Sequence, residues 1–177
     1  LMASAIRSDD PVVFFEHKAL LLKRAKEFRS NPHVPFRRYT VPFGKAQIVR
    51  PGTDLTLVTL SAGVEYALEA AEQVEKDGTS IEVIDLRSLV PLDMETVAGS
   101  VSKTGRLLVV DEDYLSFGLS AEIVAQTIEM LGPQSLRQVH RHAVPDVPIP
   151  AALSMEEAIV PGPGSILKIV REMASQS

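Results

Sequence analysis

From residue 44 onward, short runs of apolar and β-branched residues alternate with longer segments of helical periodicity. The strand-like runs are 55–60, 81–86, 106–110 and 136–140. The helix-like segments are 61–76, 93–103, 117–131 and a terminal segment from Ile166 to Met173. Because strands that alternate with helices pair through right-handed crossovers, the sequence predicts an α/β fold: a mostly parallel sheet flanked by helices.

The helical segments also predict which residues face the core. The stripe Ala121, Val124, Ile128 and Leu131 is expected to be the buried face of the third helix. The terminal helix is expected to bury Ile166, Ile169, Val170 and Met173. Asp93 precedes the second helix and is expected to be its N-cap.

The first 43 residues depart from this alternation. Residues 12–16 (VVFFE) follow the turn signal Asp9-Asp10-Pro11 and are typical of a buried strand. Lys18 to Arg29 is charged and helix-permissive, but Pro32 and Pro35 end any helix because proline has no amide donor. We interpret residues 17–44 as a connector, and the initial Leu in place of Met predicts a piece of a longer protein.

Composition excludes several functional classes. The net charge of −5 and the pI near 5.4 argue against a nucleic acid partner, because no broad basic field is available for phosphates. Apolar stretches are too short to span a bilayer, so no membrane association is expected. The absence of cysteine excludes disulfides, a thiolate nucleophile and cysteine-ligated zinc, and we expect the cytoplasm as the location.

Two candidate sites follow strands. The turn Ser61-Ala62-Gly63 opens a helix, where free amides suit a phosphate or other small anion, but capping of the helix by Ser61 is the favoured interpretation. Asp111-Glu112-Asp113 follows the third strand and offers oxygens to a hard cation such as magnesium. A solvated loop is favoured there, because adjacent side chains point in different directions.

No catalytic constellation is found among the remaining residues. His140 and His142 would share one face of a strand and resemble half of a metal site, but exposed residues after the last strand are favoured because a third ligand is missing. The other histidines are His17 and His33, and no G-x-S-x-G nucleophile motif occurs. The residues alone therefore predict a well-formed domain without catalytic residues.

A series of sequence blocks in collinear order resembles one family closely. The blocks are residues 4–18 (SAIRSDDPVVFFEHK), 41–46 (VPFGKA), 82–93 (EVIDLRSLVPLD), 100–108 (SVSKTGRLL), 118–123 (GLSAEI) and 146–150 (DVPIP). They are similar to the beta subunits of 2-oxo acid dehydrogenases, which belong to the transketolase-like thiamine-diphosphate enzymes. The resemblance covers nearly the whole chain.

This resemblance implies a domain organisation. Residues 1–16 would be the last helix and strand of a pyrimidine-binding domain, residues 17–44 the connector, and residues 45–177 a transketolase C-terminal domain. In the family, the catalytic glutamate and histidine of the beta subunit lie earlier in the pyrimidine-binding domain. The site for diphosphate and magnesium belongs to the alpha subunit. We therefore expect this chain alone to be inactive and to bind no cofactor.

The resemblance also implies what the intact enzyme does. With thiamine diphosphate and magnesium it would oxidatively decarboxylate a 2-oxo acid and transfer the acyl group to lipoamide. The implied partners are an alpha subunit, a second beta subunit and the lipoyl acyltransferase core. The implied location is the cytoplasm, or the mitochondrial matrix in a eukaryote.

One binding site carries over from relatives that hold a structural potassium ion on main-chain oxygens. The corresponding residues here are Ala5, Ile6, Ser8 and Asp10. Ser8 and Asp10 replace the Asp and Asn of those relatives, and the second half of the site comes from an earlier loop. We expect the site to be unoccupied in this chain by itself.

Two alternatives remain open. A free-standing α/β module would use the loops near Ser61 and Glu112 to hold a nucleotide or small anion. Another transketolase-like enzyme, such as a sugar-phosphate transferase, would contain the same domain. The connector from Lys18 to Arg38 is longer and more basic than is usual in the resembled family, and the 2-oxo acid stays unassigned.

Overall fold

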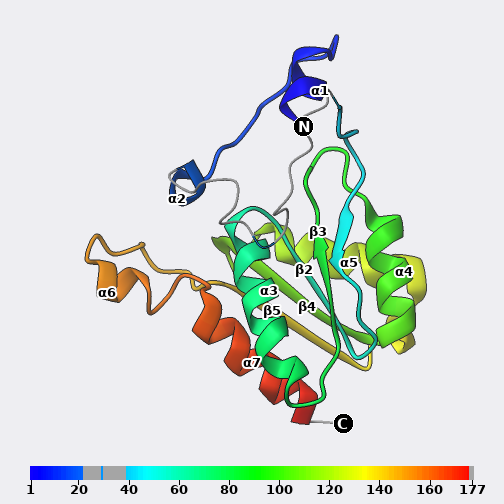
Figure 1. Cartoon of the computed structure of the whole chain (residues 1–177), viewed down its shortest axis with the longest axis vertical. Helices are drawn as coiled ribbons and strands as arrows, with labels where there is room; N and C mark the ends of the chain where they lie inside the picture. Colours follow the sequence, from blue (N-terminus) through cyan, green and yellow to red (C-terminus); the bar gives the residue numbers. More distant parts are fainter. Residues whose placement is uncertain (22–28, 30–38, 176–177) are drawn as a thin grey trace.

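The computed structural model describes residues 1–21, 29 and 39–175, and its centre is a five-stranded sheet (Figure 1). The strands are β1 (Gln47–Arg50), β2 (Leu55–Thr59), β3 (Ile81–Asp85), β4 (Arg106–Tyr114) and β5 (Gln138–Val144). Their order across the sheet is β1-β3-β2-β4-β5. Only β1 runs antiparallel to its neighbour, and the other pairs are parallel, which confirms the expected mostly parallel sheet. The short edge strand β1 was not predicted from the sequence.

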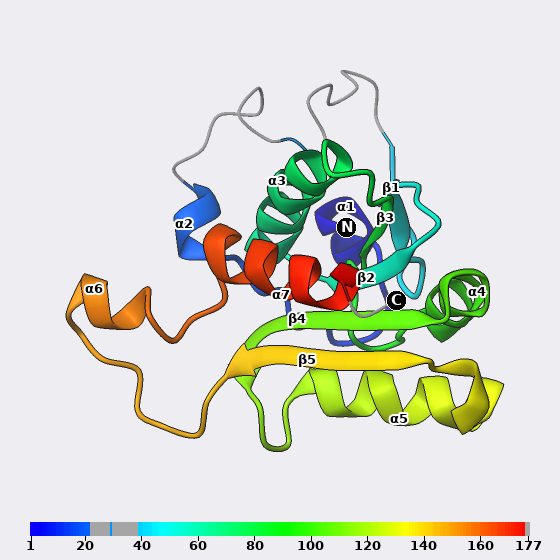
Figure 2. The same cartoon turned by 90° about the horizontal axis from the view of Figure 1, so that it is seen from below.

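Helices cover both faces of the sheet, as Figure 2 shows. They are α3 (Ala62–Glu75) and α7 (Pro163–Ser175) on one face, and α4 (Met94–Thr104) and α5 (Leu119–Leu131) on the other. Successive residues of β2 serve the two layers: Leu57 packs with α3 and α7, and Val58 packs with α4 and α5. Residues on both faces of β2 are therefore buried, including Thr56 and Thr59, as expected for a strand covered on both sides.

Polar side chains tie α4 to the sheet. Asp93 caps the helix by accepting a hydrogen bond from the Thr96 amide at 3.3 Å, which confirms the expected N-cap. Glu82 of β3 has only 3% of its side chain exposed, and its Oε2 lies 2.5 Å from Lys103 Nζ. The amide of Gly52 donates to the same oxygen at 3.2 Å, so the buried carboxylate is satisfied from two sides.

The terminal helix α7 buries Ile166, Val170 and Met173 as expected, with Ile169 packed partly against the core. In α5 the expected stripe was right only in part, because Val124 and Leu131 pack partly against the core. The fully buried residues of the helix are Ser120, Ile123 and Thr127, while Ile128 is exposed. The Thr127 hydroxyl donates to the Ile123 carbonyl at 2.7 Å, which satisfies this buried polar group. The Ser120 amide donates to Asp111, but the buried Ser120 hydroxyl has no hydrogen-bond partner among the described residues.

The expected strand at residues 12–16 is also wrong. These residues follow the short helix α1 (Met2–Ile6) as an extended segment without a strand partner among the described residues. Val13 is 78% exposed and Phe15 is 84% exposed. A strand forms only where a neighbour accepts its hydrogen bonds, and no described strand lies beside this segment.

Within the connector, the described helix is α2 (Lys18–Leu21). The rest of the helix expected up to Arg29, and the prolines and His33 that follow it, fall outside the described residues. After β5, residues 145–162 form an arm that carries α6 (Leu153–Glu156) and projects from the body (Figure 1). A short 3-10 turn, Pro133–Ser135, links α5 to β5. In residues 1–21 and 39–175, no helix is both long and apolar enough to cross a membrane.

Candidate functional site

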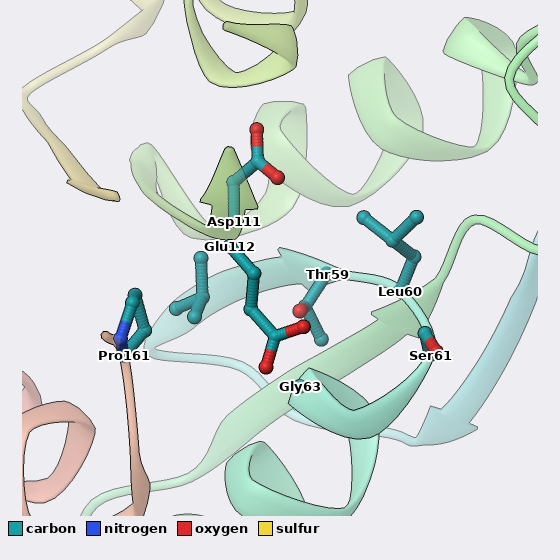
Figure 3. Close-up of a pocket in the computed structure, with 8 residues that line it drawn as sticks. Thr59, Leu60, Ser61, Gly63, Asp111, Glu112 and Pro161 are labelled. Carbon is teal, nitrogen blue, oxygen red and sulfur yellow. The ribbon is translucent and has the colours of Figure 1, made fainter. Parts of the chain in front are cut away.

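A small cavity lies where β2 and β4 end, at their carboxyl edge (Figure 3). The chain leaves β2 for β3 on one side and later places β4 on the other, so this edge is the point where the strand order reverses. Ligands of open α/β sheets bind at such points. The lining includes Thr59, Ser61, Gly63, Asp111, Glu112 and Pro161.

The cavity volume decides what fits. It measures about 90 Å³, whereas sites for cofactors and drug-sized ligands commonly measure roughly 300–1,000 Å³. The space therefore suits a few water molecules or a small ion. A nucleotide does not fit this cavity, which removes the structural basis for the nucleotide-binding alternative at this edge.

Ser61 occupies the N-cap position of α3, but the expected capping bond is absent: its side chain makes no hydrogen bond to the helix. Its backbone φ of 54° lies in the left-handed region, which turns the chain sharply from β2 into α3. Gly63 follows because a side chain there would overlap the hydroxyl of Thr59. The turn is therefore a close-packed junction.

Asp111 and Glu112 are strand residues, so the interpretation of residues 111–113 as a solvated loop was wrong for Asp111. That residue is 7% exposed and accepts hydrogen bonds from the amides of Asp113 at 3.1 Å and Ser120 at 3.3 Å. Its carboxylate thus caps the start of α5 from the end of β4. Burial raises the pKa of Asp111, although the amides oppose the shift.

Glu112 points the opposite way, toward the turn at Gly63 (Figure 3), because successive strand residues alternate between faces. Its Oε2 lies 2.8 Å from His17 Nε2. The Ala19 amide donates a hydrogen bond to His17 Nδ1 at 3.2 Å. The N–H of the ring is therefore at Nε2, which donates a hydrogen bond to Glu112. Nearby, burial raises the pKa of the Tyr66 phenol, and the charge of Glu112 adds to the shift.

These positions do not build a cation site from side chains. The carboxylates of Asp111 and Glu112 diverge, and Glu112 is engaged by the connector. Among the described residues, no group of three or more His, Asp or Glu side chains is placed to hold a metal ion. At this edge, the connector is instead joined to the end of β4 through the hydrogen bond between His17 and Glu112.

Comparison with models of protein families shows which family has this architecture. Residues 44–166 match the model of the transketolase C-terminal domain. The chain belongs to this family. The matched region begins just before β1 and ends in the first turn of α7, so it includes the whole sheet and the helices α3, α4 and α5.

Several curated proteins are similar over nearly the whole chain. The pyruvate dehydrogenase E1 component subunit beta of Bacillus subtilis is 40% identical over 98% of this chain and 51% of the relative. The 2-oxoisovalerate dehydrogenase subunit beta of the same organism is 39% identical over 98% and 52%. The acetoin:2,6-dichlorophenolindophenol oxidoreductase subunit beta of Cupriavidus necator is 38% identical over 97% and 49%. The chain spans about half the length of these relatives.

Among solved structures, a split-gene transketolase in an inactive beta4 tetramer superimposes with a TM-score of 0.67 at 25% identity. The alignment covers 82% of this chain and 45% of that one. The sheet and helices described above are therefore those of a transketolase-like domain, as the sequence resemblance implied.

Within this transketolase C-terminal domain, His140 and His142 lie on β5 and not after the last strand, which corrects the expectation. His140 is exposed. His142 is partly buried against α7, and its Nε2 lies 2.8 Å from the Ser165 hydroxyl. Ser165 also bonds the amide and carbonyl of Gly162 at 3.0 Å, so the three residues join β5 to the start of α7.

We expect His142 to make the domain lose stability at acidic pH. Burial, with a contribution from His140, lowers the pKa of His142 from 6.5 to about 4. The unfolded chain therefore binds a proton first as pH falls. Stability from this group is complete above pH 6.5 and is lost as pH falls toward 4, by about 2 kcal/mol after allowance for partial exposure.

Urea denaturation at several pH values measures this dependence. His142→Gln should flatten the fall in unfolding free energy between pH 6.5 and 4, whereas the exposed control His140→Gln should retain most of it. An equal slope in wild type and His142→Gln would contradict the assignment.

The four residues of the implied potassium site lie at and after α1, outside the region matched to the family model. The carbonyl of Ala5 accepts from the Ser8 amide at 3.2 Å. The Asp10 amide donates to the Ser8 hydroxyl at 3.2 Å. A carbonyl oxygen has a second lone pair for a cation, so these bonds leave the potassium site a prediction.

Proposed function

We propose that this chain acts as the C-terminal domain of the beta subunit of a 2-oxo acid dehydrogenase, where it supports assembly and docking. The observation that carries this proposal is the 40% identity to a pyruvate dehydrogenase beta subunit across 98% of the chain. Beta subunits for 2-oxoisovalerate and acetoin match almost equally well. The substrate class of the intact enzyme is therefore a 2-oxo acid or acetoin, without a preference among them.

The cavity at the carboxyl edge does not fit the cofactor of such an enzyme. Thiamine diphosphate with magnesium needs a site for two phosphates and carboxylate ligands for the metal. The edge cavity of about 90 Å³ is too small, and Asp111 and Glu112 point apart. In this proposal the cofactor binds to other parts of the enzyme, and no chemical step is assigned to this domain.

Exposed apolar side chains support an assembly role. Val13 and Phe15 extend without cover, Val139 lies exposed on the edge strand β5, and Phe117 is fully exposed at the loop before α5. Large apolar groups that remain exposed mark surfaces for partners. The proposed partners are an alpha subunit, a second beta subunit and the lipoyl acyltransferase core. The proposed location is the cytoplasm, or the mitochondrial matrix in a eukaryote.

The test is reconstitution with an alpha subunit, thiamine diphosphate, magnesium and each of the candidate substrates. We expect the chain to comigrate with the alpha subunit in size-exclusion chromatography but to add no decarboxylation above that of the alpha subunit alone. Addition of the N-terminal half of a homologous beta subunit should produce turnover. Turnover before that addition would contradict the non-catalytic role, and failure to form a complex would contradict the assembly role.

A second candidate is the corresponding domain of another transketolase-like enzyme. The superposition on a split-gene transketolase favours it, with a TM-score of 0.67. A sugar-phosphate substrate in the same reconstitution separates the two candidates. At Ala5, Ile6, Ser8 and Asp10, potassium binding stays a proposal, and it is checked by thermal stability of the complex in potassium against sodium salts.

A further inference from the structure

In its first half, the connector contacts the folded domain through the described residues His17 and Arg29. His17 donates to Glu112 at the carboxyl edge of the sheet. Arg29 donates its backbone amide to Glu65 Oε2 at 2.6 Å. The Arg29 guanidinium lies 3.7 Å from both Glu69 and Glu72. The contacts with Arg29 all come from α3, and they link residues that lie 36 or more positions apart in the sequence.

The three glutamates form one face of α3, because residues spaced by four and three positions stack along a helix. Their surroundings differ. Glu65, in the first turn, is only 5% exposed and accepts a specific backbone hydrogen bond. Glu69 and Glu72 are 39% and 54% exposed and contribute charge. A buried acceptor fixes the register of a bound segment, and exposed charges attract it over a longer range.

The sequence of the connector is complementary to this face. Between residues 17 and 38 it contains seven Lys and Arg residues and one Glu. The segment starts on the side of the sheet that α3 and α7 cover, where α2 lies (Figure 2). The family match begins at residue 44, so the connector lies outside the region that defines the domain.

We propose that the acidic face of α3 is the docking surface for the basic connector of the same chain. Glu65 is the anchor for the Arg29 amide, and Glu69 and Glu72 hold the guanidinium. His17 on Glu112 fixes where the connector starts. Arg29 occupies this face and His17 engages Glu112 at the edge cavity, so another basic segment can bind there only after displacing these two residues. This inference does not depend on the proposed dehydrogenase function.

The test measures hydrogen exchange of the Arg29 amide in the full chain by NMR. Glu69→Gln/Glu72→Gln removes the charges but leaves the Glu65 acceptor. We expect exchange at Arg29 to become about fivefold faster, a size suited to the loss of two exposed ion pairs. The matched control Glu122→Gln/Glu129→Gln makes the same charge change on α5, across the sheet, and should leave Arg29 exchange unchanged.

Two further measurements make the outcome decisive. Raising NaCl should speed Arg29 exchange in the wild type but not in Glu69→Gln/Glu72→Gln, because salt screens only the charges that are present. Amides of β2 and β3 should exchange equally in all variants. Equal Arg29 exchange in both double variants would overturn the proposal. So would a general rise across the sheet, or protection that depends on protein concentration, which would indicate docking between two copies.

Discussion

Replacement of Gly52 by alanine is expected to lower the free energy of unfolding by about 3 kcal/mol or more, at the upper end for overpacking a core. A Cβ at this position would overlap the backbone of β3 at Ile81 and Glu82 and would lie 2.5 Å from the Ile81 carbonyl oxygen. Backbone atoms of a central strand cannot turn aside as a side chain does. The clash would also disturb the hydrogen bond from the Gly52 amide to Glu82.

Gly99 provides the matched control, because it lies in α4 and nothing lies within 4 Å of the Cβ it would acquire. Gly99→Ala is expected to raise stability by about 0.5–1 kcal/mol through the better helix propensity of alanine. Guanidinium denaturation of both variants measures the difference. If Gly52→Ala lowers the free energy of unfolding by less than about 1 kcal/mol, the loop before β2 can move to accommodate the methyl group, contrary to our expectation.

The central part of the fold could be predicted because its strands are short runs rich in apolar and β-branched residues. β2 is buried along its whole length, so a run such as Leu55 to Thr59 is visible without knowledge of its neighbours. β1 was missed because it is a short edge strand of mixed burial that ends in Arg50. Residues 12–16 were wrongly predicted to form a strand for the opposite reason. An apolar run predicts a strand, but no strand lies beside this segment among the described residues.

For the candidate site, too, some features could be predicted from the sequence and others could not. The edge near residues 61 and 111 could be predicted, because carboxyl ends of parallel strands meet there. The separate roles of Asp111 and Glu112 depended on β4 continuing to Tyr114, which sends alternate carboxylates to opposite faces. The contact between His17 and Glu112 joins residues 95 positions apart, and no local pattern indicates it.

The connector contacts and the small volume of the edge cavity both bear on the proposed role of the domain. The carboxyl edge, which commonly binds ligands in open α/β sheets, is engaged here by residues of the same chain. Uncovered apolar groups lie among residues 12–15, at Phe117 in the loop after β4, and on β5. A domain arranged in this way is suited to contacts with partners, which agrees with the proposed role in assembly.

The second large effect is expected at the buried pair of Glu82 and Lys103. Lys103→Met should lower the free energy of unfolding by about 2 kcal/mol, less than for a fully buried pair, because the lysine side chain is 44% exposed. The methionine keeps most of the packing but leaves the Glu82 carboxylate with weaker compensation for burial. Urea denaturation at pH 7 measures the loss. Lys168→Met is the control, since that lysine is 77% exposed and faces Glu172 at 3.9 Å.

The pH dependence of this deficit separates a lost charge contact from lost packing. Burial opposes ionisation of Glu82, but hydrogen bonds led by that from Lys103 outweigh it and hold the pKa of the carboxyl below its ordinary value of 4.5. The stability from this group is present above pH 4.5 and is lost as pH falls through the lower pKa of the folded state. In Lys103→Met the pKa of Glu82 should rise, so the deficit should shrink below pH 4.5. A deficit that is constant from pH 7 to acid would assign the effect to packing and contradict the role of the ion pair.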